Sequence, residues 1–209
     1  MRVPAGTAIG NGAQRVAAFA EAVDFDAHRL ILLRGPNGSG KTTLLKTLQG
    51  LVHHRAPDTL SALRHTLYLP ERLDWADELS FAVALDALCL LPYRDVFTTL
   101  AKRLDLPQQT PYGILSKGNR QKMSVLLTEA VGWSRQIDWL LLDEPLSGLD
   151  PAAQGTLIEF WNSSTAAHRR IISSHGDLTR FSSALILHLA EGSISPVTAP
   201  LTTSLSQDA

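Results

Sequence analysis

The chain has 209 residues, of which 44% are hydrophobic and 19% are charged, and its formal net charge is −1. This length and composition are typical of one globular domain with a sizeable core and room for an inserted subdomain. The charge balance lacks the basic excess of a dedicated DNA- or RNA-binding protein, so no nucleic-acid partner is expected. The single cysteine, Cys89, excludes an internal disulfide and fits a reducing compartment, and its apolar neighbours indicate a packed core thiol.

The sequence also predicts a protein that stays in the cytoplasm. No apolar run reaches the roughly 20 residues that a membrane-spanning helix needs. The N-terminal residues lack the long apolar core of a signal peptide. Work at a membrane would therefore require another chain to provide the spanning part.

A phosphate-binding motif lies in the first quarter of the chain. Residues 16–27 alternate loosely between apolar and polar and predict edge strands that lead into a buried strand at residues 30–34. Residues 35–42 then read Gly-Pro-Asn-Gly-Ser-Gly-Lys-Thr, which matches the pattern G-x-x-x-x-G-K-S/T at every specified position. An amphipathic helix, expected to run to about residue 51, follows and points its positive dipole end at the loop. A glycine-rich turn without a ligand is the alternative. It accounts poorly for a strand, a glycine-rich loop, a Lys-Thr pair and a helix in this order.

The residue types of this loop fit a nucleotide polyphosphate. Its glycines let the backbone wrap closely around phosphate groups, so that N–H groups point inward. Lys41 adds a positive charge for the β- and γ-phosphates, and the Thr42 hydroxyl is placed to ligate Mg²⁺. The expected ATP-binding residues are Gly35, Pro36, Asn37, Gly38, Ser39, Gly40, Lys41, Thr42 and Thr43.

The central part of the chain predicts helices inserted into an α/β protein. His53 and His54 form a polar link, for which a solvated turn is a better explanation than a metal site, and residues 67–69 predict a short strand. From about residue 75 to residue 130 the apolar spacing is helical. The positions expected on buried helix faces are Leu79, Phe81, Ala82, Val83, Leu85 and Leu88, and then Val96, Leu100 and Leu104. Three prolines are expected to divide this region into short helices: Pro92, Pro107 and Pro111.

The last third of the chain returns to strands. They are expected at residues 140–142, 170–174, 184–189 and 193–197, the last two as a closing hairpin. Between the first two strands, Asp150 caps a helix that starts at Pro151. The tail from residue 198 is rich in Ser and Thr, has little to bury and is expected to be disordered.

Two adjacent acids end the strand at residues 140–142. Because successive strand residues point to opposite sides, Asp143 and Glu144 can do different jobs. Asp143 is expected to hold Mg²⁺, directly or through water, and Glu144 to polarise the attacking water as a general base. A solvent-exposed acidic strand end is the alternative, which the phosphate loop upstream makes the weaker explanation.

A second phosphate-binding surface precedes the helix that follows residue 116. Residues 115–122 read Leu-Ser-Lys-Gly-Asn-Arg-Gln-Lys. The Ser116 hydroxyl, the Gly118 N–H and the helix dipole can meet a phosphate there, although alone they would indicate a simple helix cap. Between the phosphate loop and the two acids, the stretch resembles the signature motif of ATP-binding-cassette (ABC) ATPases, at Ser116, Lys117, Gly118 and Asn119. Over nearly all its length the chain is similar to a nucleotide-binding subunit of an ABC transporter.

The resemblance implies further site residues and partners. Residues 147–150, Ser-Gly-Leu-Asp, are similar to the family's D-loop, with Asp150 as its acid, and His175 falls at the position of the family's switch histidine. The resemblance implies binding of ATP and Mg²⁺ and a head-to-tail dimer with itself or a paralogous subunit. Each ATP would lie between the phosphate loop of one subunit and the signature of the other. Separate transmembrane permease chains are implied as partners, which would hold the subunit on the inner face of the cell membrane.

Three features depart from the family's pattern. Lys117 stands where the commonest form has glycine and Asn119 where it has glutamine, while the serine and the second glycine are kept. Glu71 stands at the Q-loop position, where glutamine is usual, and its carboxylate either approaches Mg²⁺ and the lytic water or begins a solvated loop. No adenine-stacking aromatic is evident upstream of the loop, because residues 9–12 occupy that place and Phe19 lies too close to the strand.

These features predict an α/β fold, a phosphate-loop NTPase of ABC type with a mainly parallel sheet core. An antiparallel N-terminal β part and an inserted helical subdomain complete it. The catalytic core is expected at residues 1–70 and 136–197, the helical subdomain at residues 71–135 and the disordered tail at residues 198–209.

The function expected from the resemblance is an ATPase that drives a membrane transporter. The compact insertion and the lack of a regulatory domain favour an exporter by analogy, and the permease is expected to dock near residues 71–85. Two alternatives remain open. One is a soluble ABC ATPase that acts on the ribosome or on DNA, although such proteins usually carry two cassettes or a long coiled coil. The other is a nucleotide sensor without turnover, against which Glu144 and His175 argue.

Overall fold

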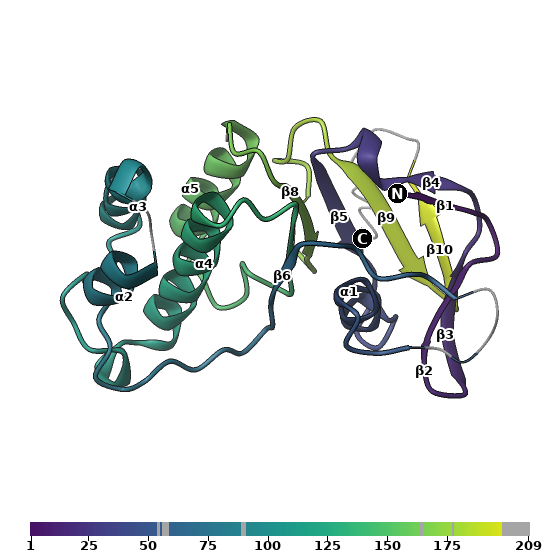
Figure 1. Ribbon diagram of the computed structural model, residues 1–209, viewed down its shortest axis with the longest axis horizontal. Coiled ribbons are helices and arrows are strands. Elements are labelled where there is room, and N and C mark those ends of the chain that lie inside the picture. The colour runs from purple at the N-terminus through teal and green to yellow at the C-terminus, as the bar shows by residue number, and fades with distance from the viewer. Residues whose placement is uncertain (54, 56–58, 89–90, 164, 177, 198–209) are drawn as a thin grey trace, which may run out of the picture.

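An eight-stranded mixed sheet forms the centre of the fold (Figure 1). The computed structural model describes residues 1–53, 55, 59–88, 91–163, 165–176 and 178–197. Across the sheet the strands follow the order β2, β3, β10, β9, β5, β8, β7, β6, and β1 pairs with β4 separately. The strands are β1 (Arg2–Val3), β2 (Ala8–Asn11), β3 (Gln14–Phe19), β4 (Val23–Asp24), β5 (Leu30–Arg34), β6 (Thr66–Leu69), β7 (Trp139–Leu142), β8 (Arg169–Ser173), β9 (Leu185–Ala190) and β10 (Ser193–Pro196).

The parallel part of the sheet brings four separate loops to one edge. From β9 through β5, β8 and β7 to β6, neighbouring strands run parallel, whereas β2 with β3 and β9 with β10 pair antiparallel. This confirms the predicted mixed sheet with an antiparallel N-terminal part. The carboxyl ends of parallel strands share an edge, where ligands of open α/β sheets bind. The segments that follow β5, β6, β7 and β8 therefore meet there.

The parallel strands β5 and β7 are buried on both faces. In β5, Leu30 and Leu32 belong to one apolar cluster, and Ile31 and Leu33 belong to the other. Helix α1 packs against one face of the sheet, and α4 contacts β6 and β7 on the other. The helices are α1 (Lys41–Gln49), α2 (Phe81–Leu88), α3 (Leu91–Arg103), α4 (Lys117–Ser134) and α5 (Pro151–Ser163). Burial on both faces explains why these strands read as unbroken apolar runs.

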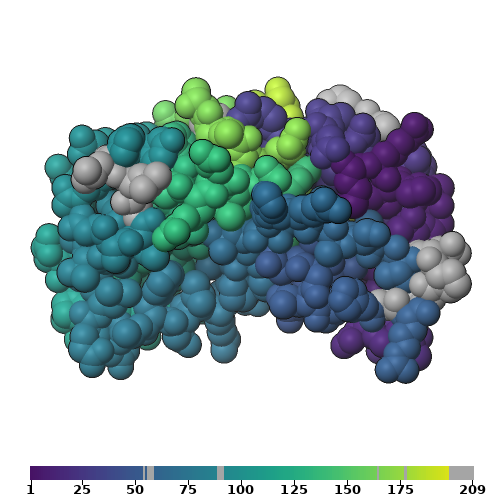
Figure 2. Space-filling model, in the orientation of Figure 1, coloured from purple at the N-terminus to yellow at the C-terminus, as the bar shows by residue number. Residues whose placement is uncertain are grey.

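The inserted helices form the other half of the molecule. Helices α2 and α3 pack on α4, away from the sheet (Figure 1). Figure 2 shows the helical half and the strand-rich half joined in one elongated surface. As expected, the region near Pro92 is divided into two helices, α2 and α3, and Pro92 lies in the first turn of α3, where its missing N–H costs no hydrogen bond.

Two apolar positions of these helices were predicted wrongly. Val83 is 58% exposed and Val96 is 39% exposed, although both were expected on buried faces. In α2 the buried stripe is made by Phe81, Ala84 and Leu85, whose i, i+3, i+4 spacing leaves Val83 on the opposite side. Leu100 in α3 and Leu104 directly after that helix are buried as expected.

The remaining elements lie close to their predicted positions. The helix after the phosphate loop ends at Gln49, where Gly50 adopts the left-handed conformation of a helix C-cap. The strands β1 and β2 were not predicted. The predictions for Cys89, His54 and residues 198–209 concern residues outside the described part of the chain. Within that part, none of the helices combines the length and hydropathy of a membrane-spanning segment.

Candidate active site

The phosphate loop connects β5 to α1 and depends on its glycines. Gly38 and Gly40 have φ values of +79° and +103°, which favour glycine. A Cβ on Gly40 would also lie 2.7 Å from Cγ1 of Val16 on β3, and one on Gly35 would lie 2.1 Å from the carbonyl oxygen of Leu189 on β9. The loop is therefore held tightly between the antiparallel hairpin and the sheet.

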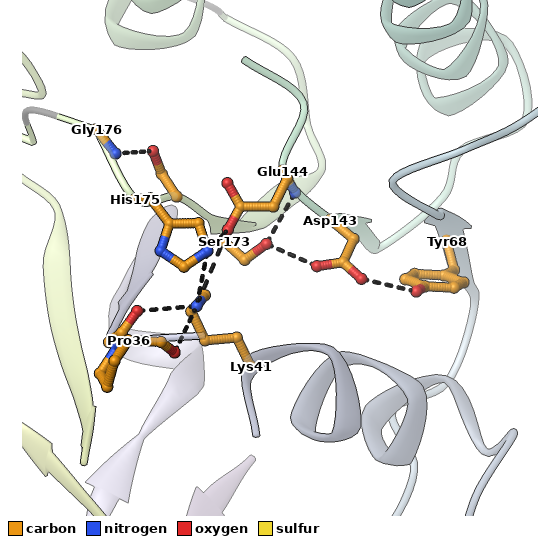
Figure 3. A network of polar contacts seen from close by, with 10 residues as sticks. Pro36, Lys41, Tyr68, Asp143, Glu144, Ser173, His175 and Gly176 are labelled. Atoms are coloured by element: carbon orange, nitrogen blue, oxygen red, sulfur yellow. Dashed lines mark hydrogen bonds and ion pairs between the residues drawn. The ribbon is translucent and has the colours of Figure 1, made fainter. Parts of the chain in front are cut away.

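Lys41 points back over the loop (Figure 3). Its Nζ donates to the carbonyl oxygens of Gly35 at 2.9 Å and Pro36 at 3.2 Å, and it lies 3.2 Å from Nε2 of His175. Lys41 is only 6% exposed. Burial lowers the pKa of Lys41, and the negative charges of Glu144 and Asp143 oppose that shift. A desolvated ammonium group at this place is suited to bind an anion.

Glu144 and His175 meet above the lysine (Figure 3). Oε1 of Glu144 lies 3.0 Å from Nε2 of His175 and 4.0 Å from Nζ of Lys41, yet it accepts no hydrogen bond among the described residues. Glu144 also has φ +48°, an uncommon conformation for a residue other than glycine. Burial raises the pKa of Glu144, although the nearby His175 and Lys41 charges oppose this. A more basic carboxylate with a free lone pair suits a general base.

Asp143 is buried and held from two neighbouring strands. It is 2% exposed, and its Oδ1 accepts from the Ser173 hydroxyl at 2.7 Å, while its Oδ2 accepts from the Tyr68 hydroxyl at 3.0 Å. The Ser173 oxygen in turn accepts from the Glu144 N–H at 2.8 Å. Burial and the Asp143 charge raise the pKa of Tyr68, so its phenol stays protonated and can donate. Tyr68 and Ser173 thus fix both acids, and neither was predicted from the sequence.

A pocket of about 450 Å³ surrounds the loop and gathers most of the predicted site. Its lining consists of Gln14, Arg15, Val16, Asn37, Gly38, Ser39, Gly40, Lys41, Thr42, Thr43, Glu71, Glu144 and His175. Glu71 thus shares a pocket with Thr42. All phenylalanine, tyrosine and tryptophan residues lie in the described part of the chain, and none of them lines this pocket. Phe19 is 1% exposed and packs edge-on against Phe25.

The residues that resemble the signature motif lie outside the phosphate-loop pocket. The Ser116 hydroxyl caps α4 by accepting from the Asn119 N–H at 3.2 Å. A Cβ on Gly118 would lie 3.4 Å from the carbonyl oxygen of Gly148, next to the segment that was compared with a D-loop. In that segment Asp150 accepts from the Ala153 N–H at 2.8 Å. None of Ser116, Lys117, Gly118 and Asn119 is among the residues that line the phosphate-loop pocket.

The oxygen groups of the site fit Mg²⁺. Thr42 and Glu71 line the same pocket, and a hydroxyl and a carboxylate both supply oxygen, the ligand atom that this hard cation prefers. Both oxygens of Asp143 already accept protein hydrogen bonds, which suits contact through water better than direct ligation.

Comparisons with known proteins agree with this geometry. A family described as ABC transporter matches residues 21–147. The zinc import ATP-binding protein ZnuC of Paramagnetospirillum magneticum is 33% identical over 68% of this chain and 55% of its own length. The cytochrome c biogenesis ATP-binding export protein CcmA of Rhodobacter capsulatus is 32% identical over 81% of this chain and 79% of its own length. The chain spans 55% and 54% of the length of two ZnuC relatives, about half of each.

Solved structures show the same fold. An ATP-binding subunit of an ABC transporter superposes with a TM-score of 0.71 at 22% identity, covering 93% of this chain and 88% of the other. A bacterial Atm1-family ABC exporter with ATP bound gives a TM-score of 0.68 at 18% identity, covering 92% of this chain and 37% of the other. At such identities the likeness concerns the fold alone.

Proposed function

Because this chain belongs to the ABC transporter family, we propose that it hydrolyses ATP to drive transport through separate membrane chains. The observation that carries the proposal is the meeting of Lys41, Glu144 and His175 in one pocket at the carboxyl edge of the sheet. A protein that only packs or docks has no need of a desolvated lysine facing a carboxylate with raised pKa.

The proposed chemistry divides the work among these residues. The phosphate loop and Lys41 hold the β- and γ-phosphates, and Glu144 accepts a proton from the attacking water. His175, in contact with both, orients Glu144 and holds the γ-phosphate end of the pocket. Mg²⁺, held by Thr42 and Glu71 and through water by Asp143, would supply positive charge at the phosphates.

We propose a head-to-tail dimer because one chain provides only part of a site. The signature residues Ser116 to Asn119 are outside the phosphate-loop pocket and lie beside Gly148. A second chain, this one or a paralogue, would bring its Ser116 and Gly118 against the open side of the first chain's pocket. Each ATP would then be enclosed by two chains.

We propose export as the direction of transport. Of the relatives named above, the export protein CcmA matches over the larger share of both chains. The permease would dock on the groove beside Glu71, where a cavity of about 550 Å³ reaches from Arg72 and Asp74 to Tyr112 and Arg120.

Purification from the native cell distinguishes this proposal from its alternatives. Recovery of a membrane chain together with the ATPase is expected. Recovery with ribosomes or DNA would instead support a soluble ABC ATPase. Tight ATP binding without phosphate release, in the presence of the membrane chain, would support a nucleotide sensor.

We further infer that Arg15 meets the nucleobase. Gln14, Arg15 and Val16 line the phosphate pocket where no phenylalanine, tyrosine or tryptophan does, and Arg15 forms no ion pair with a described residue. A planar guanidinium can stack on a base as an aromatic ring does.

Arg15→Ala is therefore expected to weaken ATP binding roughly tenfold, at the lower end of the 1–3 kcal/mol measured for stacking on a base. Inorganic tripolyphosphate lacks the base, and its affinity is expected to stay unchanged. Arg15→Tyr serves as the matched control and should keep the affinity for ATP. Calorimetry of the three proteins with both ligands checks this, and equal losses for ATP and tripolyphosphate would place Arg15 at the phosphates instead.

A further inference from the structure

A buried ionic cluster lies outside the pocket. Glu129 of α4 is 0% exposed and accepts from Nε and Nη2 of Arg170, both at 2.7 Å. It also accepts from Nε1 of Trp161 at 2.8 Å, and Nε2 of His168 lies 3.1 Å from it. These residues, called the Glu129 cluster below, are Glu129, Trp161, His168 and Arg170.

Both oxygens of the Glu129 carboxylate accept hydrogen bonds in this cluster, and a positive guanidinium faces its negative charge. Burial alone would raise the pKa of Glu129, but the Arg170 guanidinium outweighs it, with help from His168, and lowers the pKa to about 2. The guanidinium also lies over the ring of Phe160, with 5.8 Å between its central carbon and the ring centroid. The carboxylate is therefore ionised at neutral pH, and both of its oxygens are used.

The cluster joins three elements that each carry one motif of the proposed composite site. Glu129 is on α4, which begins directly after Ser116. Trp161 is on α5, which begins directly after Asp150. Arg170 is on β8, and His175 follows the end of that strand. Glu129 lies about 18 Å along α4 from Lys117, the first residue of the helix, at a rise of roughly 1.5 Å per residue. No residue of the Glu129 cluster lines the phosphate-loop pocket.

Stability alone does not require charges at this place. The surrounding cluster of α4, α5 and sheet residues is apolar, and replacing a buried ion pair by apolar side chains is often neutral or stabilising. Apolar contacts are non-directional, whereas a two-bond contact between arginine and carboxylate fixes both the rotation and the axial position of the helix that carries it. Nearer the signature, α4 is tied by a bond from Gln121 to the Pro145 carbonyl at 3.2 Å and by Lys122, whose Nζ lies 3.7 Å from the carboxylate of Asp150, a residue exposed to solvent.

We propose that the Glu129 cluster is a positioning device for the composite ATP site. It fixes α4 and α5 on β8, so that the signature, the D-loop and the switch histidine are presented to a second chain in one arrangement. The proposal rests on the ATPase function proposed above. Its residues are positioning residues and do not take part in the chemical step.

The double variant Glu129→Gln with Arg170→Met tests this role. The glutamine keeps partners for Trp161 and His168, and the methionine fills the space of the arginine stem, while both charges disappear. The melting temperature of the variant is expected to lie within about 5 °C of that of the wild type, because both charges are removed together. Its affinity for ATP is expected to stay within about twofold of the wild-type value, because the two substituted residues share no partner with Lys41. Its turnover is expected to fall by about 10- to 100-fold, the scale of a small misplacement of reacting groups.

Two single variants complete the experiment. Arg170→Lys keeps the charge but cannot reproduce the two-bond contact, so it should also lose turnover at unchanged ATP affinity. Glu159→Gln changes a residue of α5 and removes the negative charge of an exposed ion pair with Arg103 of α3. This variant should behave as the wild type. The ATP-dependent association of two chains is measured with Glu144→Gln added to each protein. It should weaken for the double variant and for Arg170→Lys, and it should stay normal for Glu159→Gln.

The outcomes separate this proposal from the function on which it rests. A wild-type chain that releases no phosphate from ATP would overturn the proposed function. An active wild type with an equally active, stably folded double variant would overturn only the positioning role. If the double variant does not fold, Arg170→Lys decides: normal turnover and association in that protein would show that the cluster serves stability alone.

Discussion

Lys41→Ala is expected to abolish ATP binding while the fold survives. Lys41 places its charge at the centre of the pocket, 4.0 Å from Glu144 and within hydrogen-bond distance of two loop carbonyls. Hydrogen bonds to charged groups contribute about 1.5–3 kcal/mol each, so losing those to two phosphates lowers the affinity by roughly 10²-fold or more. The carbonyls of Gly35 and Pro36 are left facing an open pocket, where water replaces the lysine.

Calorimetry and circular dichroism on the same samples check this result. Lys46→Ala provides the matched control, because Lys46 lies near the other end of α1 and outside the pocket. Its affinity for ATP should equal that of the wild type. If Lys41→Ala also bound ATP almost normally, the loop would not be the phosphate site.

Glu144→Gln is expected to keep ATP binding and to lose hydrolysis by roughly 10²-fold or more, the scale of a lost general base. Glutamine preserves the size of the side chain but cannot accept the proton of the attacking water. Phosphate release at saturating ATP measures the effect, and Glu21→Gln, which alters an exposed carboxylate outside the pocket, should leave it unchanged. A mutant that hydrolyses ATP at the wild-type rate would move the base to His175 or Glu71.

The fold was largely predictable because its strongest signals are local. The apolar run of β5, the loop after it and the helix α1 are contiguous, and each constrains the next. The parallel strands β5 and β7 read as continuous apolar segments because both of their faces are buried. Val83 and Val96 were misplaced because an apolar side chain at helical spacing does not reveal which face a neighbouring helix covers.

The supporting contacts of the site could not be predicted from spacing. Tyr68 and Asp143 are 75 residues apart, and Ser173 and Asp143 are 30 apart. Tyr68 and Ser173 are polar residues on the strands β6 and β8 that flank β7, and only the strand order shows that they lie beside Asp143. The same holds for Glu129, a charged residue on a buried helix face whose partner Arg170 lies 41 residues away.

The fold places Glu71, the glutamate at the Q-loop position where glutamine is usual, at the phosphate-loop pocket. Glu71 is exposed and lines the pocket that also contains Thr42 and Glu144, and this position supports the proposed role of its carboxylate at Mg²⁺. The structure agrees with the sequence that no aromatic residue is placed to stack on adenine. Gln14, Arg15 and Val16 line the phosphate-loop pocket, and no phenylalanine, tyrosine or tryptophan does.

ATP-dependent association of two chains tests the central claim, the composite site, most directly. Light scattering of Glu144→Gln is expected to show a dimer with ATP and a monomer without it. Adding Ser116→Arg puts bulk and positive charge into the signature, which does not line the chain's own phosphate-loop pocket, so ATP binding by the monomer should persist while the dimer is lost. A Ser116→Arg protein that dimerises on ATP as well as its parent would contradict the claim that the signature of one chain completes the site of another.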